Sequence, residues 1–324
     1  MNFVVYLHWL YSECNGGLNV QLQLAKRLSE KGFKTKVRMQ EGHDIPNPIY
    51  NDFYREGDVN DDTIAVYIDI FDTNPLNAKR VVKWCIYGSK NYEKYADDDI
   101  IYYFAPFCKN NKSNKRLCPV YIPSFVENHH SRRIRESCYI IKKGEYYPYS
   151  DNLIPGFKRK GIISFINSSQ KPLHVGFIKK HTDLVNIFNE TKYFFCYDPV
   201  SFLPVIALLC GCIVIQHPIP GYTESEWINS GSYFGGAGGN YSRIPGIAYG
   251  EENLRWAIAT MPYVEQFIRE WLKVTDTTVD SFIDDLQNKE CAPEKCYKFN
   301  ESPYSFQHKD CRPIPKQWKD YKFM

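Results

Sequence analysis

The residues from Pro199 to Thr223 include no Asp, Glu, Lys or Arg, and this uncharged run constrains the fold more than any other stretch. A helix that spans a membrane needs about 20 continuous apolar residues. Here Pro204 and Gly211 interrupt the run, and Ser201 is suited to cap a helix that ends at the glycine. The run and the residues just before it therefore predict a buried strand, a loop, a short helix and a second buried strand.

The same alternation of strand and helix appears near the N-terminus. "NFVVYLHWL" predicts a strand, "YSECNGG" a loop, "LNVQLQLAKRLSEKG" a helix with one apolar face, and "FKTKVRMQ" the next strand. "DDTIAVYIDIF" predicts another strand and "AKRVVKWCIYG" a strand or a helix, while "ENLRWAIATMPYVEQFIREWL" and "TTVDSFIDDLQ" predict two separate helices. Apolar strands that alternate with helices are typical of parallel sheets covered on both faces.

The pattern begins twice along the chain. We therefore predict an α/β protein with two Rossmann-like, doubly wound domains, residues 1–128 and 136–300, that face a central cleft, followed by a tail at 301–324. Ligands of such open sheets bind beyond the carboxyl ends of the strands. The residues that follow the predicted strands are thus the candidates for a site.

Charge and cysteine content limit the partners and the compartment. The chain has 40 basic and 37 acidic residues, a net charge of +3, so no field of one sign favours nucleic acid as a partner. Eleven cysteines, an odd number that includes several in apolar runs, indicate reduced thiols in a cytoplasmic protein. The first residues lack a basic leader and a cleavage site, so we expect a first strand there and no transmembrane segment. A peripheral position at a membrane stays open.

Several polar residues gather at the front of the uncharged run. Tyr197 ends a predicted strand and Asp198 follows it, and Ser201 lies at a helix start, where free N–H groups favour a phosphate. Lys142 and Lys143 follow another predicted strand and are expected to supply countercharge to a diphosphate. The alternative is that Ser201 only caps its helix and that Asp198 only fixes the turn.

Five segments, in the same order, resemble GT-B glycosyltransferases. "ECNGGLNVQLQLAKRLSEKGFKTKV" resembles their first loop and helix, and "YDPVSFLPVIALLCGCIVI" resembles their donor-binding segment. "YIDIFDTNPLNAKRVVKW", "CYIIKKG" and "GIAYG" resemble segments of a bacterial and viral branch that builds surface polysaccharide. The resemblance implies a nucleotide diphosphate-sugar as donor substrate, no cofactor, and a role for Gly16 and Gly17 near the sugar. It also places Asp198 at the first of two donor-binding carboxylate positions, but the second is Ile206, which argues against a retaining mechanism on that template.

An inverting transfer needs a base that takes the proton of the acceptor hydroxyl. The candidates at predicted strand ends are His8, His43, Asp44, Asp69 and Asp72. We favour Asp44 and Asp72 as catalytic residues because each lies in a loop rich in Pro and Asn, although such loops also use Asp simply to form turns. Glu224, upstream of a glycine-rich segment, is expected to bind sugar hydroxyls. The acidic runs precede strands, so we predict no essential metal.

These observations predict a glycosyltransferase that moves a sugar from a nucleotide diphosphate to a hydroxyl of a glycan or glycolipid, with no nucleic acid as partner. Two alternatives remain open. A nucleotide-sugar epimerase would use the same two-domain cleft. A non-catalytic sugar-binding module would explain the absent second carboxylate.

Overall fold

The computed structural model describes residues 1–8, 12–13, 15–39, 46–113, 115–141, 173–219, 221–232, 234 and 243–288. The chain divides into two compact units. Unit 1 comprises Met1–Tyr121 and Trp271–Tyr297, and unit 2 comprises Ile122–Glu270 and Lys298–Met324. The predicted strand "KGIISFI" and the predicted tail at 301–324 lie outside the described residues.

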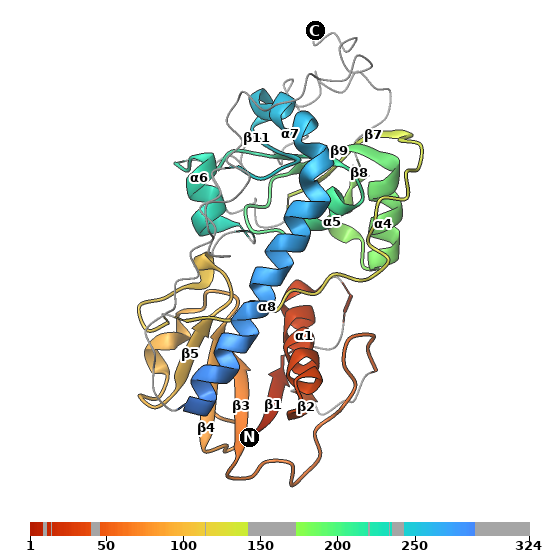
Figure 1. Cartoon of the computed structure of the whole chain (residues 1–324). Coiled ribbons are helices and arrows are strands. Elements are labelled where there is room, and N and C mark those ends of the chain that lie inside the picture. Colours follow the sequence, from red (N-terminus) through yellow and green to blue (C-terminus); the bar gives the residue numbers. More distant parts are fainter. Residues whose placement is uncertain are drawn as a thin grey trace. The chain divides into compact units, whose positions relative to one another are not determined.

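Unit 1 is built on a parallel sheet of six strands, in the order β2-β1-β3-β4-β5-β6 (Figure 1). The strands are β1 (Asn2–Leu7), β2 (Lys34–Met39), β3 (Thr63–Ile68), β4 (Arg80–Cys85), β5 (Ile100–Tyr103) and β6 (Lys115–Arg116). All six residues of β3 are buried, because strands on both sides and cover on both faces leave it no solvent contact. The segment predicted as strand or helix is strand β4.

Helix α1 (Gly16–Glu30) connects β1 to β2. It begins where the side chain of Asn15 accepts a hydrogen bond from Leu18 N at 3.1 Å. It ends before Gly32, whose φ of +88° is a conformation that favours glycine. Its predicted apolar face, Leu18, Leu22, Ala25 and Leu28, is fully buried, so this element is as the sequence predicts.

Helix α8 (Val264–Asn288) lies beside α1 on the same face of the unit 1 sheet. Arg27 of α1 contacts Asp276 of α8 at 2.9 Å, and the Phe282 ring lies 6.0 Å from that of Phe3 in β1. The prediction of two separate C-terminal helices is wrong in its boundary. Residues 271–275 (WLKVT) contain no Gly or Pro and continue the helix, whereas Pro262 lies in a 3₁₀ turn (η7, Met261–Tyr263) that separates α7 (Leu254–Thr260) from α8.

The opposite face of this sheet is covered by connecting segments. Its core holds Tyr6, Ala65, Tyr67, Ala78 and Val81, packed against Val59, Phe71 and Leu76 from the connections. Lys83 of β4 is buried here with 1% of its surface exposed. Its Nζ donates to Phe71 O at 3.1 Å and to Thr73 O at 2.6 Å, and it lies 4.9 Å from the centre of the Tyr67 ring. The lysine thus holds the loop that follows β3.

Unit 2 contains a second parallel sheet, of five strands in the order β11-β10-β9-β7-β8. The strands are β7 (Arg135–Ile140), β8 (Leu173–His174), β9 (Thr191–Cys196), β10 (Ile213–Gln216) and β11 (Ile247–Tyr249). On one face, Leu254 and Ala257 of α7 pack against Phe195 and Ile215. Helix α4 (His181–Glu190) places Phe188 5.0 Å from Phe194, whose side chain leaves β9 on the other face.

The uncharged run folds as predicted, with β9 before it and α5 (Leu203–Leu209) and β10 within it. Gly211, at a φ of +82°, turns the chain from α5 into β10. Arg133 joins the ends of α4 and α5: it donates to Phe188 O at 2.6 Å and to Cys210 O at 2.7 Å. No described helix is long and apolar enough to cross a bilayer.

Short helical segments complete the described chain. They are η1 (Lys90–Lys94), η2 (Pro106–Cys108), η4 (Val175–Phe177), α6 (Glu224–Glu226), the π-helix η5 (Trp227–Gly231) and η6 (Glu251–Asn253). The predicted α/β class, with two parallel sheets, is confirmed.

Candidate functional site

Three polar side chains follow strands at the carboxyl edge of the unit 1 sheet. His8 comes directly after β1, Asp69 directly after β3, and Tyr87 two residues after β4. Because all six strands are parallel, these residues lie along one edge, together with the first turn of α1.

Hydrogen bonds join His8 to α1 and to Tyr87. The Nδ1 atom of His8 lies 3.2 Å from Nε2 of Gln21, and its Nε2 atom lies 2.9 Å from Oη of Tyr87. The same Gln21 Nε2 donates to Gly17 O at 2.9 Å. A carbonyl only accepts, so this contact places the NH₂ group of Gln21 beside His8 and makes His8 Nδ1 an acceptor. The ring proton of the neutral histidine then resides on Nε2, and His8 donates to Tyr87 Oη.

Burial keeps both rings neutral. It lowers the pKa of His8 from 6.5 to about 4, so the imidazole is uncharged at neutral pH. Burial, and then the nearby Asp69 carboxylate, raise the pKa of Tyr87 above its usual value. Tyr87 therefore keeps its proton, although its side chain is 43% exposed.

Asp69 fixes the backbone that follows β4 at this edge. It is fully buried, and its carboxylate accepts hydrogen bonds from the backbone N–H groups of Ile86 and Tyr87, both at 3.1 Å, and of Ser89 at 2.7 Å. With its oxygens engaged by backbone donors, Asp69 shapes the turn that carries Tyr87. These contacts support a structural role and give no support to the alternative that Asp69 is a base.

Gly17 is placed against Tyr87. A Cβ atom at position 17 would lie 2.0 Å from Tyr87 Oη, whereas one at Gly16 would meet nothing within 4 Å. Only glycine allows the tyrosine hydroxyl to approach the helix backbone this closely. Sequence reasoning selected Gly17 but missed Gln21 and Tyr87, which carry no local motif.

Of the two favoured catalytic aspartates, only Asp72 lies among the described residues. Asp72 is partly exposed and forms an ion pair with Lys94 at 3.1 Å. The hydrogen bond and charge of Lys94 lower its pKa, which makes its carboxylate a weaker base. Asp44, like His43, lies outside the described residues. Their catalytic roles stay predictions.

At the carboxyl edge of unit 2, the predicted donor-binding residues Asp198 and Ser201 accept backbone hydrogen bonds in the turn before α5. Tyr197 is 1% exposed, and its ring centre lies 5.0 Å from that of His217, which follows β10. Asp198, 3% exposed, accepts from Val200 N at 3.1 Å, and Ser201 Oγ accepts from Leu203 N at 3.2 Å. Lys142 and Lys143 lie outside the described residues. Donor binding by these residues stays a prediction.

Glu224 forms part of a polar cluster near β11. Its carboxylate contacts Arg243 Nε at 3.1 Å, and the Arg243 guanidinium lies 4.4 Å from the centre of the Trp256 ring and donates to Asn253 Oδ1 at 2.9 Å. Burial raises the pKa of Glu224, and Arg243 opposes this shift. Sequence reasoning missed Arg243, which lies in the glycine-rich segment.

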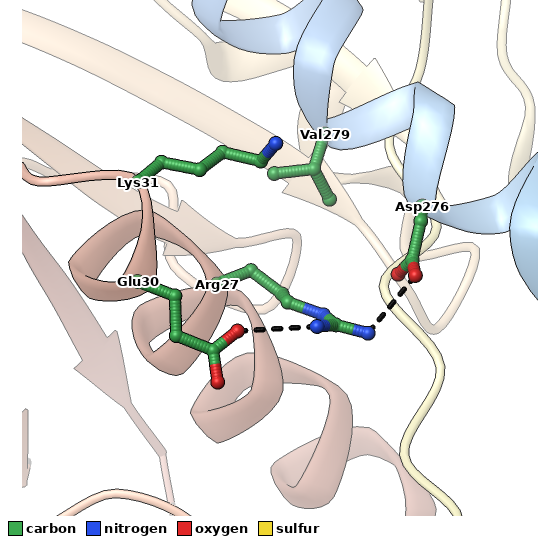
Figure 2. A pocket seen from close by; sticks show the side chains of 5 residues that line it. All are labelled: Arg27, Glu30, Lys31, Asp276 and Val279. Carbon is green, nitrogen blue, oxygen red and sulfur yellow. Dashed lines mark hydrogen bonds and ion pairs between the residues drawn. The ribbon is translucent and has the colours of Figure 1, made fainter.

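A pocket of about 260 Å³ lies between α1 and α8 (Figure 2). It is lined by Arg27, Glu30, Lys31, Asp276 and Val279, and Arg27 contacts both acidic neighbours. Two positive and two negative side chains cancel, which leaves no net charge for a ligand. The pocket lies at the end of α1, at the amino edge of the sheet and opposite His8, so we do not assign the site to it.

No set of three or more His, Cys, Asp or Glu side chains suited to a metal occurs among the described residues. The seven described cysteines are buried and free of disulfides. Burial raises the pKa of Cys85 and Cys138 to about 12, so these thiols are not nucleophiles near neutral pH.

No family model and no curated protein match the chain. Among solved structures, an α-glucosyltransferase in complex with UDP and a 13-mer DNA aligns with 10% identity and a TM-score of 0.45, covering 89% of this chain and 98% of the other. The T4 phage protein BGT with UDP-glucose aligns with 10% identity and a TM-score of 0.42, covering 88% and 96%. Sucrose-phosphate synthase from Thermosynechococcus elongatus aligns with 10% identity and a TM-score of 0.43, covering 89% and 99%.

The prediction of no nucleic acid, with a glycan or glycolipid acceptor, is contradicted by these comparisons. Several of the similar structures are of a DNA-modifying enzyme or contain DNA. The physical error lies in the use of net charge, because a near-neutral protein can still contact phosphates through a few local basic groups. At identities near 10% and TM-scores below 0.5, the function has to be argued from the chain's own residues.

Proposed function

We propose that this protein is a glycosyltransferase that moves a sugar from a nucleotide diphosphate-sugar to a hydroxyl group. The observation that carries the proposal is the set of hydrogen bonds among His8, Gln21, Gly17 and Tyr87 at the carboxyl edge of unit 1. Two members of this set, Gly17 and Gln21, lie in the segment whose sequence resembles the first loop and helix of GT-B enzymes. Neutral, proton-carrying groups held in fixed orientation suit a reaction that moves a proton between oxygens.

Unit 2 offers groups for the donor. Asp198 at the end of β9 is suited to hydroxyls of the ribose or the sugar, and Ser201 to a diphosphate oxygen. Lys142 and Lys143 would supply the countercharge that other transferases obtain from a metal, so the proposed reaction needs none. The base is proposed to come from unit 1, with Asp44 and Asp72 as candidates. The acceptor is left as a hydroxyl compound, and nucleic acid is one class to be tested.

The test is incubation of the full chain with UDP-, dTDP- and GDP-sugars. Each sugar is tried with water, with simple glycosides and with duplex DNA that carries a hydroxymethylated base as acceptors. Release of nucleotide diphosphate with a new glycoside supports the proposal. Formation of an isomerised nucleotide sugar instead supports an epimerase, and stabilisation by glycans but by no nucleotide refutes both enzymes.

Ser201 allows a sharper test of donor binding. We expect Ser201→Ala to weaken nucleotide diphosphate affinity roughly tenfold or more, because hydrogen bonds to an anion contribute about 1.5–3 kcal/mol each. Thr223→Ala is the matched control, since Thr223 caps α6 of the same unit with a hydrogen bond from Glu226 N. Both variants lose a hydroxyl that accepts a backbone N–H at the start of a helix, and only the first should lose affinity in calorimetry. Equal affinities would remove Ser201 from the site.

A further inference from the structure

At the carboxyl edge of unit 1, the described hydrogen bonds leave the proton of the Tyr87 hydroxyl undirected. Gln21 donates to Gly17 O, which makes His8 Nδ1 an acceptor and His8 Nε2 a donor to Tyr87 Oη. Because Tyr87 accepts from His8, its own O–H bond has to point elsewhere.

We propose that Tyr87 contacts the substrate: its hydroxyl donates a hydrogen bond to a substrate oxygen, and His8 holds it in the orientation that makes this possible. This inference rests on the proposed function and names a residue for it. Sugar transfer offers suitable partners, since the donor sugar, the diphosphate and the acceptor all present oxygens.

The tyrosine is held in place from three sides. Asp69 accepts from its backbone N–H at 3.1 Å, Gly17 leaves room for its hydroxyl against α1, and the ring lies edge-on to His8 with 5.3 Å between the ring centres. A side chain fixed in this way loses little entropy when it binds a ligand, so its hydrogen bond contributes more to affinity.

The same tyrosine is open to a ligand. Its side chain is 43% exposed, and Ile70, directly after Asp69 on the same edge, is 40% exposed. Large apolar side chains beside an oriented polar group are typical of ligand sites. The raised pKa of Tyr87 keeps the hydroxyl protonated, and therefore able to donate, throughout the physiological range.

Tyr87→Phe is the direct test, because it removes the hydroxyl and retains the ring. With the nucleotide sugar that the wild type uses, we expect kcat/KM to fall about tenfold or more while the midpoint of thermal unfolding stays within a few degrees. His8→Gln keeps an N–H donor and should retain more activity than His8→Leu, which has none. A role in packing alone would give Tyr87→Phe the same kcat/KM as the wild type, and that result would overturn the inference.

A second readout does not depend on turnover. In ¹⁵N-labelled protein, NMR should show His8 protonated at Nε2, and nucleotide sugar or acceptor should shift this resonance in the wild type but not in Tyr87→Phe. Gly17→Ala, which pushes the hydroxyl away, should also change the His8 signal, whereas Gly16→Ala should not. A proton on Nδ1 would refute the proposed orientation.

The two proposals fail in different ways. If the wild type releases no nucleotide diphosphate from any sugar tested, the proposed function falls and this inference falls with it. If the wild type is active and Tyr87→Phe is equally active, only the inference falls.

Discussion

Acid should destabilise this protein through one buried histidine. His8 is only 6% exposed, and burial lowers its pKa to about 4, against 6.5 for an exposed imidazole. The folded state therefore keeps His8 neutral over a pH range in which the unfolded state binds a proton. Stability from this residue is fully present above pH 6.5 and is lost as the pH falls towards 4.

The magnitude follows from the two pKa values. Between pH 7.5 and pH 5, the unfolded chain gains nearly one proton at this site and the folded chain gains about a tenth of one. The linkage relation then gives a loss of about 2 kcal/mol in the free energy of unfolding, rising to about 3 kcal/mol at pH 4. For a domain of ordinary stability, this is a large part of the total.

The assay compares the wild type with His8→Gln, whose amide does not titrate. Urea unfolding at pH 7.5, 6 and 5 gives the free energy of each by linear extrapolation. Carboxylates titrate equally in both proteins, so the difference between the two pH profiles isolates His8. We expect the wild type to lose about 2 kcal/mol more than the variant. Parallel profiles, or an NMR titration of His8 near pH 6.5, would refute the assigned burial.

Two further predictions concern cations that donate to backbone carbonyls, each with a surface control. Lys83→Met should destabilise the protein by about 1–3 kcal/mol because two backbone carbonyls lose their donor, whereas Lys79→Met, at an exposed ion pair, should cost less than about 1 kcal/mol. Arg133→Ala should cost about 2–3 kcal/mol because it leaves the carbonyls at two helix ends unpaired, whereas exposed Arg132→Ala should stay within about 0.5 kcal/mol. Denaturant unfolding measures both pairs, and similar effects within a pair would contradict the corresponding contacts.

The prediction of no nucleic acid as a partner was wrong because it relied on net charge, whereas the wrong helix boundary came from the local sequence pattern. A sum over 324 residues describes the field far from the protein. Recognition depends on a few groups at one surface, and the sum contains no information on where those groups lie.

Local sequence determined the elements whose boundaries depend on neighbouring residues. The apolar face of α1, its stop at Gly32 and the strand–helix–strand order around the uncharged run were all predictable, because periodicity and backbone preference act over a few positions. The break between α7 and α8 was also readable in principle from Pro262. We predicted the break between the two helices after residue 272, too far along the chain, because the apolar pattern continues past Pro262.

The contacts at the candidate site were decided by tertiary structure alone. His8 and Tyr87 are 79 positions apart, and His8 and Gln21 are 13 apart; nothing near Tyr87 in the sequence distinguishes it from the other 24 tyrosines. They meet because the parallel order of β1, β3 and β4 brings the ends of these strands to one edge. The sequence determined which segments form strands and helices, whereas the protonation of His8 and the orientation of Tyr87 depend on burial and on partners that only the folded chain brings together.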